Sequence, residues 1–146
     1  MTAEKMWSKF AKTAGIAPDT PYEAWAFGGA PDSLAALTLD GIKTATASAH
    51  ALYAIEGEDL PQVGEYSVIL DSADRAVCVI RTTRVTVVPY DKVSAEHAYK
   101  EGEGDRSLAY WRTVHEAFFT DCLREAGLSF TPDMDVVCEE FTKVYP

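Results

Sequence analysis

The chain has 146 residues, and its hydrophobic fraction of 47% is enough for one domain with a core of its own. No apolar run approaches the roughly 20 residues that a membrane helix needs, and no secretory signal is present, so we expect a cytoplasmic protein without a membrane partner. The formal net charge of −10 opposes loose binding to nucleic acid, and no DNA partner is expected. Three widely spaced cysteines indicate neither a disulfide framework nor a zinc site.

The first half of the chain alternates between helical and extended patterns. Apolar residues recur at helical spacing over residues 3–14, with Thr2 placed as a cap and Gly15 as a stop. The elements expected after this helix are a short strand at 22–27, a helix at about 32–40, an extended Thr-rich segment at 43–48 and a short helix at 49–57.

The second half is dominated by a long β-branched strand and a long helix. The elements expected here are a turn that feeds a strand over 60–71, a strand at 76–90, a short helix at 94–99, a long helix at 107–127 and a final strand at 136–145. The two central strands are close enough in sequence to form a hairpin. Strands separated by helices at irregular intervals predict an α+β fold, a mixed β-barrel with helices packed around it, over residues 1–146 as a single domain.

Basic residues gather in one short stretch of this acidic chain. Residues 75–93 hold four basic residues and one acidic residue, and both flanks are acidic. Arg75, Arg81 and Arg84 in this stretch suit a focused site for one phosphate or a short strand better than an extended duplex groove. Solvated arginines on a strand would explain the pattern equally well.

The most informative local pattern is a glycine and a lysine followed by hydroxyl residues. On an extended chain Thr44, Thr46 and Ser48 share one face, and Lys43 lies at the junction before them. A hydroxyl beside an amine can serve as a nucleophile with its base, provided that burial keeps the amine partly neutral. A plain Thr-rich strand is the structural alternative.

Three carboxylates alternate with glycines in the segment EGEGD. Glu101, Glu103 and Asp105 could direct oxygens to one point, as a hard cation such as Mg²⁺ requires. The spacing matches no known metal loop. The alternative is a solvated turn in which Asp105 lies near the positive N-terminus of the long helix.

Aromatic residues and histidines have to be weighed against the needs of the core. Trp25 is the best candidate for an exposed ring on which a base could stack. The rings that we expect on the apolar, core-facing side of the long helix are those of Trp111, Phe118 and Phe119. His115 is expected there as a satisfied core histidine, and His97 shows no partner by spacing.

The sequence resembles the ASCH domain family from about residue 22 to the end. The segments that carry the resemblance are WAFGGAPD, GIKTATAS, LPQVGEYSVILD, the arginine-bearing central strand and EGEGD before a tryptophan helix, in the family's order and spacing. The resemblance implies a PUA-like β-barrel, whose cleft in related folds binds RNA or modified bases. The partner that we expect is therefore RNA or a modified nucleoside.

Candidate chemistry also follows from the resemblance, because some short members deacetylate N(4)-acetylcytidine and other members cleave RNA. In the deacetylating members the functional residues are the lysine and second threonine of G-x-K-T-x-T and a glutamate in the helix after the central strand. These positions correspond here to Lys43, Thr46 and Glu101. The chain has Ala47 and Ser48 where the short members have an arginine, and it carries an N-terminal helix and a long tryptophan helix that they lack.

Residues and resemblance together predict a hydrolase that acts on an acylated nucleoside or on RNA. Lys43 would take a proton from Thr46, Thr46 would attack the acyl carbonyl, and Glu101 would orient Lys43 or relay a proton. Arg81 would hold a phosphate or a base carbonyl, and we expect all four side chains to line a common cleft. The residues expected to contact the ligand are Trp25, Thr44, Ser48, Arg81, Glu103 and Asp105.

No cofactor is expected for deacylation, whereas RNA cleavage would admit a divalent metal at the EGEGD segment. The alternative function is a non-catalytic module that binds a nucleotide or RNA and regulates another process. In that case Lys43 and Arg81 contact anionic groups, and Thr46 only donates a hydrogen bond. Turnover on a panel of nucleosides and RNAs separates the two functions.

Overall fold

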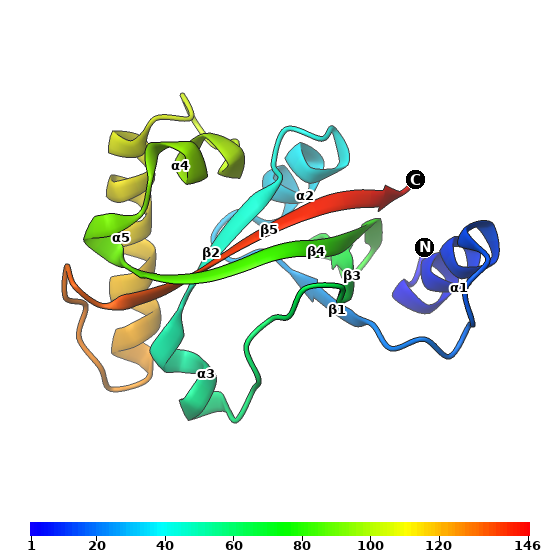
Figure 1. The fold of residues 1–146 in the computed structure, drawn as a ribbon, viewed down its shortest axis with the longest axis horizontal. Coiled ribbons are helices and arrows are strands. Elements are labelled where there is room, and N and C mark those ends of the chain that lie inside the picture. The colour runs from blue at the N-terminus through cyan, green and yellow to red at the C-terminus, as the bar shows by residue number, and fades with distance from the viewer.

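The computed structural model describes every residue from 1 to 146 (Figure 1). The helices are α1 (Ala3–Ala14), α2 (Pro31–Leu39), α3 (His50–Glu56), α4 (Ala95–Glu101) and α5 (Leu108–Glu125), with a 3-10 turn at Tyr90–Lys92. The strands are β1 (Glu23–Ala26), β2 (Ala45–Ala49), β3 (Tyr66–Leu70), β4 (Ala76–Pro89) and β5 (Asp135–Tyr145). Each helix and strand expected from the sequence is present, so the α+β class is confirmed.

The five strands form one mixed sheet in the order β1-β3-β4-β5-β2. β1 pairs with β3 in parallel, and the other pairings are antiparallel, including the β3–β4 hairpin. The sheet curls into a half-barrel rather than the expected barrel, because β1 and β2 are edge strands that do not pair with each other. Irregular register between Val79 and Ile80, and between Thr82 and Arg84, marks bulges that help to bend the long strand β4.

Local signals explain where the helices begin and end. The hydroxyl of Thr2 accepts a hydrogen bond of 3.1 Å from the backbone N–H of Lys5, which caps α1, and Gly15 ends that helix with a φ of 69°. Ser94 and Ser107 cap α4 and α5 in the same way. These caps are the ones that the sequence predicts.

The helices cover different parts of the sheet and divide the core into three apolar clusters. α1 packs Trp7 and Phe10 against β3 and β4, and α2 packs Leu34 against the middle of the sheet. α4 and α5 cover the far end, where Trp111 and Phe119 are buried with residues of β5. Figure 1 shows α4 and α5 at one end of the long strands β4 and β5, and α1 at the other end.

The expected core positions of Trp111 and Phe119 are confirmed, but Phe118 is only half-buried. Its ring lies against Gly28 at the end of β1, where an added Cβ would lie 2.7 Å from a ring carbon. Because Gly28 has no side chain, α5 approaches this end of β1 closely. Phe118 therefore packs against the edge of the core around Phe119 and also lines a pocket of the protein.

None of the helices has the length and apolarity that spanning a membrane requires. The three cysteines carry free thiols, as the sequence predicts. Burial raises the pKa of Cys78 to about 11 and that of Cys138 to about 12, which suits inert core thiols.

Candidate functional site

The backbone brings the segment before β2 against the end of α4. The N–H of Thr44 donates to the carbonyl of Lys100 at 2.8 Å. Gly102, which ends α4 with a φ of 74°, lies so close to residue 42 that an added Cβ would be 2.8 Å from the carbonyl oxygen of Ile42. A residue with a side chain would force the two segments apart, so this glycine permits Lys43 to meet Glu101.

Lys43 is fully buried and forms ion pairs with two carboxylates. Its Nζ lies 3.3 Å from Oε1 of Glu101 and 3.0 Å from Oε2 of Glu103, and the residue is 1% exposed. The same ammonium group lies 5.1 Å from the centre of the Phe27 ring. No hydrogen bond joins Lys43 to Thr46, and the hydrogen bonds of its amine all go to residues 101 and 103.

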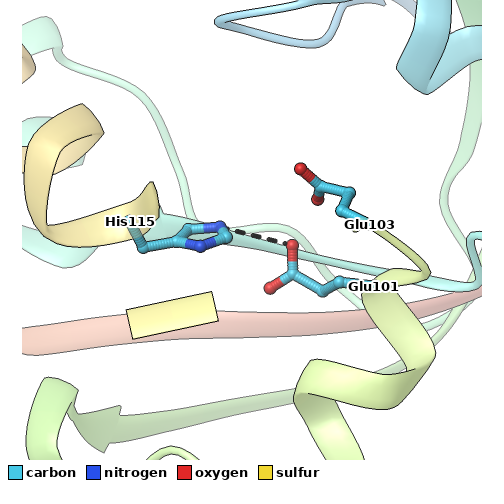
Figure 2. A group of neighbouring side chains, drawn as sticks. All are labelled: Glu101, Glu103 and His115. Atoms are coloured by element: carbon cyan, nitrogen blue, oxygen red, sulfur yellow. Dashed lines mark ion pairs between the residues drawn. The ribbon is translucent and has the colours of Figure 1, made fainter. Parts of the chain in front are cut away.

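The carboxylate of Glu101 is the centre of this buried cluster. One oxygen contacts Nε2 of His97 at 2.7 Å and accepts from Nε1 of Trp111 at 2.5 Å. The other contacts Lys43 and, at 3.4 Å, Nε2 of His115 (Figure 2). Burial alone would raise the pKa of Glu101, but the hydrogen bonds of His115 and His97 and the charge of Lys43 outweigh it, so the pKa lies well below its ordinary value.

The cluster includes a set of possible metal ligands, namely Glu101, Glu103 and His115, with one ligand atom of each within 4.8 Å of the others (Figure 2). Lys43 already supplies a positive charge between the two carboxylates. A divalent ion at the same point would meet strong repulsion from the ammonium group. The donor set therefore does not fit a metal while Lys43 holds this position.

A pocket of about 1020 Å³ lies between the two edge strands, and we call it the β1–β2 pocket. Its lining residues are 21–28, 46–48, Tyr53, 58–62, 65–67, Phe118 and Glu139. The lining contains five acidic residues and neither lysine nor arginine. Its walls also carry the aromatic rings of Tyr22, Trp25 and Phe118, so the pocket is both negatively charged and partly apolar.

Hydroxyl and carboxyl groups of β2, α3 and β5 line one wall of the β1–β2 pocket. Thr46 lies directly opposite Glu139 in the β2–β5 pairing. The hydroxyls of Ser48 and Tyr53 are 2.7 Å apart. Glu139 is 8% exposed, and its Oε2 accepts a hydrogen bond of 2.7 Å from Thr82.

The charge environment of Glu139 is opposite to that of Glu101. Burial raises the pKa of Glu139; the hydrogen bond from Thr82 opposes this effect, and the charges of Glu65 and Glu23 add to it. No lysine, arginine or histidine forms an ion pair with Glu139.

The common cleft expected for four residues is not formed. Thr46 lines the β1–β2 pocket, whereas Lys43 and Glu101 contact each other in the buried cluster and do not line the pocket. Arg81 is exposed and lies over the ring of Tyr66, 5.0 Å from its centre, so it flanks a residue of the pocket wall without lining the pocket. The cleft prediction fails because Lys43 is buried against residues 101 and 103, whereas Thr46, an odd number of positions later on the extended chain, faces the pocket.

The other expected ligand contacts divide in a similar way. Trp25 and Ser48 line the β1–β2 pocket, and Glu103 belongs to the Lys43 cluster. The backbone N–H of Thr44 donates a hydrogen bond to the carbonyl of Lys100 in α4. Asp105 is exposed and accepts a hydrogen bond of 2.9 Å from the N–H of Ser107, so it supports the turn before α5 and lies apart from both groups.

Two residues, one in the Lys43 cluster and one on the wall of the β1–β2 pocket, were not among the site residues predicted from the sequence. His97 was expected to lack a partner, but it contacts Glu101 four residues later on α4. The i,i+4 spacing on a predicted helix is a signal that could have found this pair. Glu139 has no such local signal, because a glutamate in an alternating strand is usually solvent-exposed.

Comparisons with known proteins agree with the architecture. The family model described as the ASCH domain matches residues 23–145. The structure is similar to the crystal structure of an ASCH domain from Lactobacillus crispatus, with a TM-score of 0.86, 31% identity and coverage of 97% of this chain and 96% of that chain. It is also similar to a protein from Enterococcus faecalis, with a TM-score of 0.88, 36% identity and coverage of 97% and 87%. No curated protein matches the sequence. The chain therefore belongs to the ASCH domain family, as its motifs predict.

Proposed function

We propose that the protein binds one nucleoside unit, free or unstacked from single-stranded RNA, in the β1–β2 pocket. The observation that supports this most is the pocket wall, which combines aromatic rings with hydroxyl and carboxyl groups. The pocket volume of about 1020 Å³ is at the upper end of the range of about 300–1,000 Å³ for small-molecule sites. A general link of the ASCH family to RNA binding supports the same proposal.

Charge decides which part of the ligand enters. Five acidic residues and no basic residue line the pocket, so a phosphate inside it would be repelled. The base and ribose are uncharged and can occupy the interior, where Trp25 offers a stacking surface. Arg81, which forms no ion pair and lies against Tyr66 of the wall, is placed to contact a phosphate outside.

Calorimetric titration with nucleosides, nucleoside monophosphates and short single-stranded RNAs tests this proposal. We expect saturable binding of nucleosides and weaker binding when a phosphate must enter the pocket. Trp25→Ala should weaken binding by about 1–3 kcal/mol, the contribution of one base stacked on an aromatic ring. Tyr99→Ala, which removes an exposed ring outside the pocket, is the matched control. Absence of binding by the whole panel would exclude the function.

Hydrolysis of an N-acyl group on the bound base is the second candidate function. It is favoured by the position of Thr46 on the pocket wall and by the contact of Lys43 with Phe27, another residue of that wall. The amine of Lys43 is buried and bonded to residues 101 and 103, so this mechanism requires Lys43 and Phe27 to rearrange before the amine can meet Thr46. It also requires a neutral Lys43, a state that its ion pairs with Glu101 and Glu103 oppose. Thr46 attacks the acyl carbonyl, Lys43 takes the hydroxyl proton and passes it to the leaving amine, and water then hydrolyses the acyl-threonine ester.

Glu101 has a narrower role in this mechanism than the sequence predicts. Both of its oxygens are already engaged by Lys43, His97, Trp111 and His115. It can therefore hold Lys43 in place but has no free lone pair with which to relay a proton. RNA cleavage is less well supported, because no basic residue lines the pocket to stabilise a phosphorane.

Two substitutions separate catalysis from binding. Thr46→Ala should abolish turnover of N(4)-acylated cytidine and leave its affinity within a few-fold, because the hydroxyl acts chiefly in the transition state. Lys43→Arg keeps the charge but cannot serve as a base at neutral pH. Thermal melting must show that this buried variant is folded. Substantial turnover by either folded variant would exclude the lysine–threonine mechanism.

A further inference from the structure

The structure contains two buried glutamates whose surroundings differ fundamentally. Glu101 is enclosed by hydrogen-bond donors and a lysine in the core. Glu139 on β5 is also buried, at 8% exposed against 1% for Glu101, but its one protein partner is the hydroxyl of Thr82. That bond uses Oε2, and Oε1 has no partner in the protein. No fully buried polar side-chain atom lacks a partner, so the unpaired Oε1 is accessible, and Glu139 lines the β1–β2 pocket.

The one contact that the fold gains from a carboxyl at position 139 is the hydrogen bond from the buried hydroxyl of Thr82. A buried carboxylate without a cationic partner is destabilising, and two further acids, Glu65 and Glu23, act on it from the same pocket. The neighbouring positions Val136, Val137 and Cys138 of β5 are all buried and carry no charge. A group that opposes folding and lines a cavity is a candidate for ligand recognition.

We propose that Glu139 selects a nucleobase that bears an exocyclic amino group, by accepting a hydrogen bond from that amine through Oε1. This inference rests on the proposed nucleoside-binding function of the same pocket. A carboxylate oxygen accepts from the amine of cytosine or adenine but is repelled by a keto oxygen at the same place, as in uracil or hypoxanthine.

The surroundings of Glu139 complete this recognition surface. Thr46 is its direct partner across the β2–β5 pairing, and Ser48 follows on the same face of β2. Both line the pocket and can contact the remaining polar atoms of the base edge. Trp25 lines the same pocket and offers a face for the ring. An N-acylated amino base keeps one N–H, so the same contact would also orient a substrate for hydrolysis.

Calorimetric affinities for two matched pairs of nucleosides test the inference. Cytidine and uridine differ at the amino or keto group of the base, as do adenosine and inosine. The wild-type protein should bind the amino member of each pair about 10- to 100-fold more tightly, because a hydrogen bond to a charged group is gained and a repulsion avoided. In Glu139→Gln the preference should fall to within about threefold, since an amide can face either group.

Glu140→Gln is the matched control. It makes the same chemical change one residue along β5, at a side chain that pairs with Lys100 and does not line the pocket. It should keep the wild-type preference.

The outcomes are distinct for the two proposals. The role of Glu139 would be overturned if the wild type bound both members of each pair equally well. It would also be overturned if folded Glu139→Gln kept the full preference for the amino nucleosides. Nucleoside binding itself would stand in either case. Failure of all four nucleosides to bind would overturn the proposed function and this inference with it. Should Glu139→Gln not fold, the wild-type comparison decides the question by itself.

Discussion

Replacing Glu101 by glutamine tests whether the buried cluster around Lys43 holds the α4 end of the molecule together. The substitution keeps the side-chain shape but removes the charge, and it turns an NH₂ group toward one pair of the surrounding donors. Breaking a buried ion pair by changing one partner costs about 3–5 kcal/mol. An unfolding entropy of about 2.1 cal/mol/K per residue converts each kcal/mol into about 3 °C for a chain of this length. The melting temperature should therefore fall by about 10–16 °C.

Thermal and urea denaturation at neutral pH would measure this loss. Glu103→Gln is the control, because Glu103 contacts the same ammonium group but its side chain is 16% exposed, so its loss should be less than half as large. A double-mutant cycle with Lys43→Met should give a coupling energy of about 1–3 kcal/mol. A Glu101→Gln protein that melts within about 3 °C of the wild type, or a cycle without coupling, would refute the reasoning.

The remaining predictions concern the second buried glutamate, one glycine and one tryptophan. Because the pKa of Glu139 is raised, its ionisation opposes folding as the pH rises above the ordinary glutamate pKa. Glu139→Gln should therefore raise the melting temperature at pH 7 but not near pH 4. An equal effect at both pH values would contradict this. Gly102→Ala should destabilise by about 1–3 kcal/mol more than Gly127→Ala in urea denaturation, because both glycines have a positive φ but only Gly102 faces a backbone oxygen at 2.8 Å; equal losses would show that the close approach to Ile42 is not required. Trp111→Ala should cost about 3–5 kcal/mol through the lost core contacts, and wild-type melting behaviour of this variant would disprove the core assignment.

The pH dependence of the wild type follows from the two glutamates acting in opposite directions. The lowered pKa of Glu101 contributes stability that is present above the unfolded-state pKa and is lost as the pH falls through the folded-state value. The raised pKa of Glu139 has the reverse sign, since its contribution turns unfavourable as the pH rises.

The secondary structure and the family follow from local signals in the amino-acid sequence. Helix α1 is specified by apolar spacing, by Thr2 at its start and by Gly15 at its end. Each of these signals acts on the backbone within a few residues of its own position. The β3–β4 hairpin follows from two β-branched runs joined by a short turn. Signals of this kind involve residues close together in the chain, so they can be recognised without a structure. The motifs that mark the ASCH family are short segments of the same kind.

Contacts between distant polar residues, by contrast, depend on how the chain folds in three dimensions. Lys43 and Glu101 lie 58 positions apart, and they come together because a backbone bond from Thr44 and the missing side chain of Gly102 allow β2 and α4 to touch. The separation of Thr46 from Lys43 and the isolation of Glu139 depend on how far the half-barrel curls and on which strands remain at its edges. Burial changes a carboxyl group's energy according to everything packed around it, so two glutamates that look alike in the sequence have opposite roles in the folded protein.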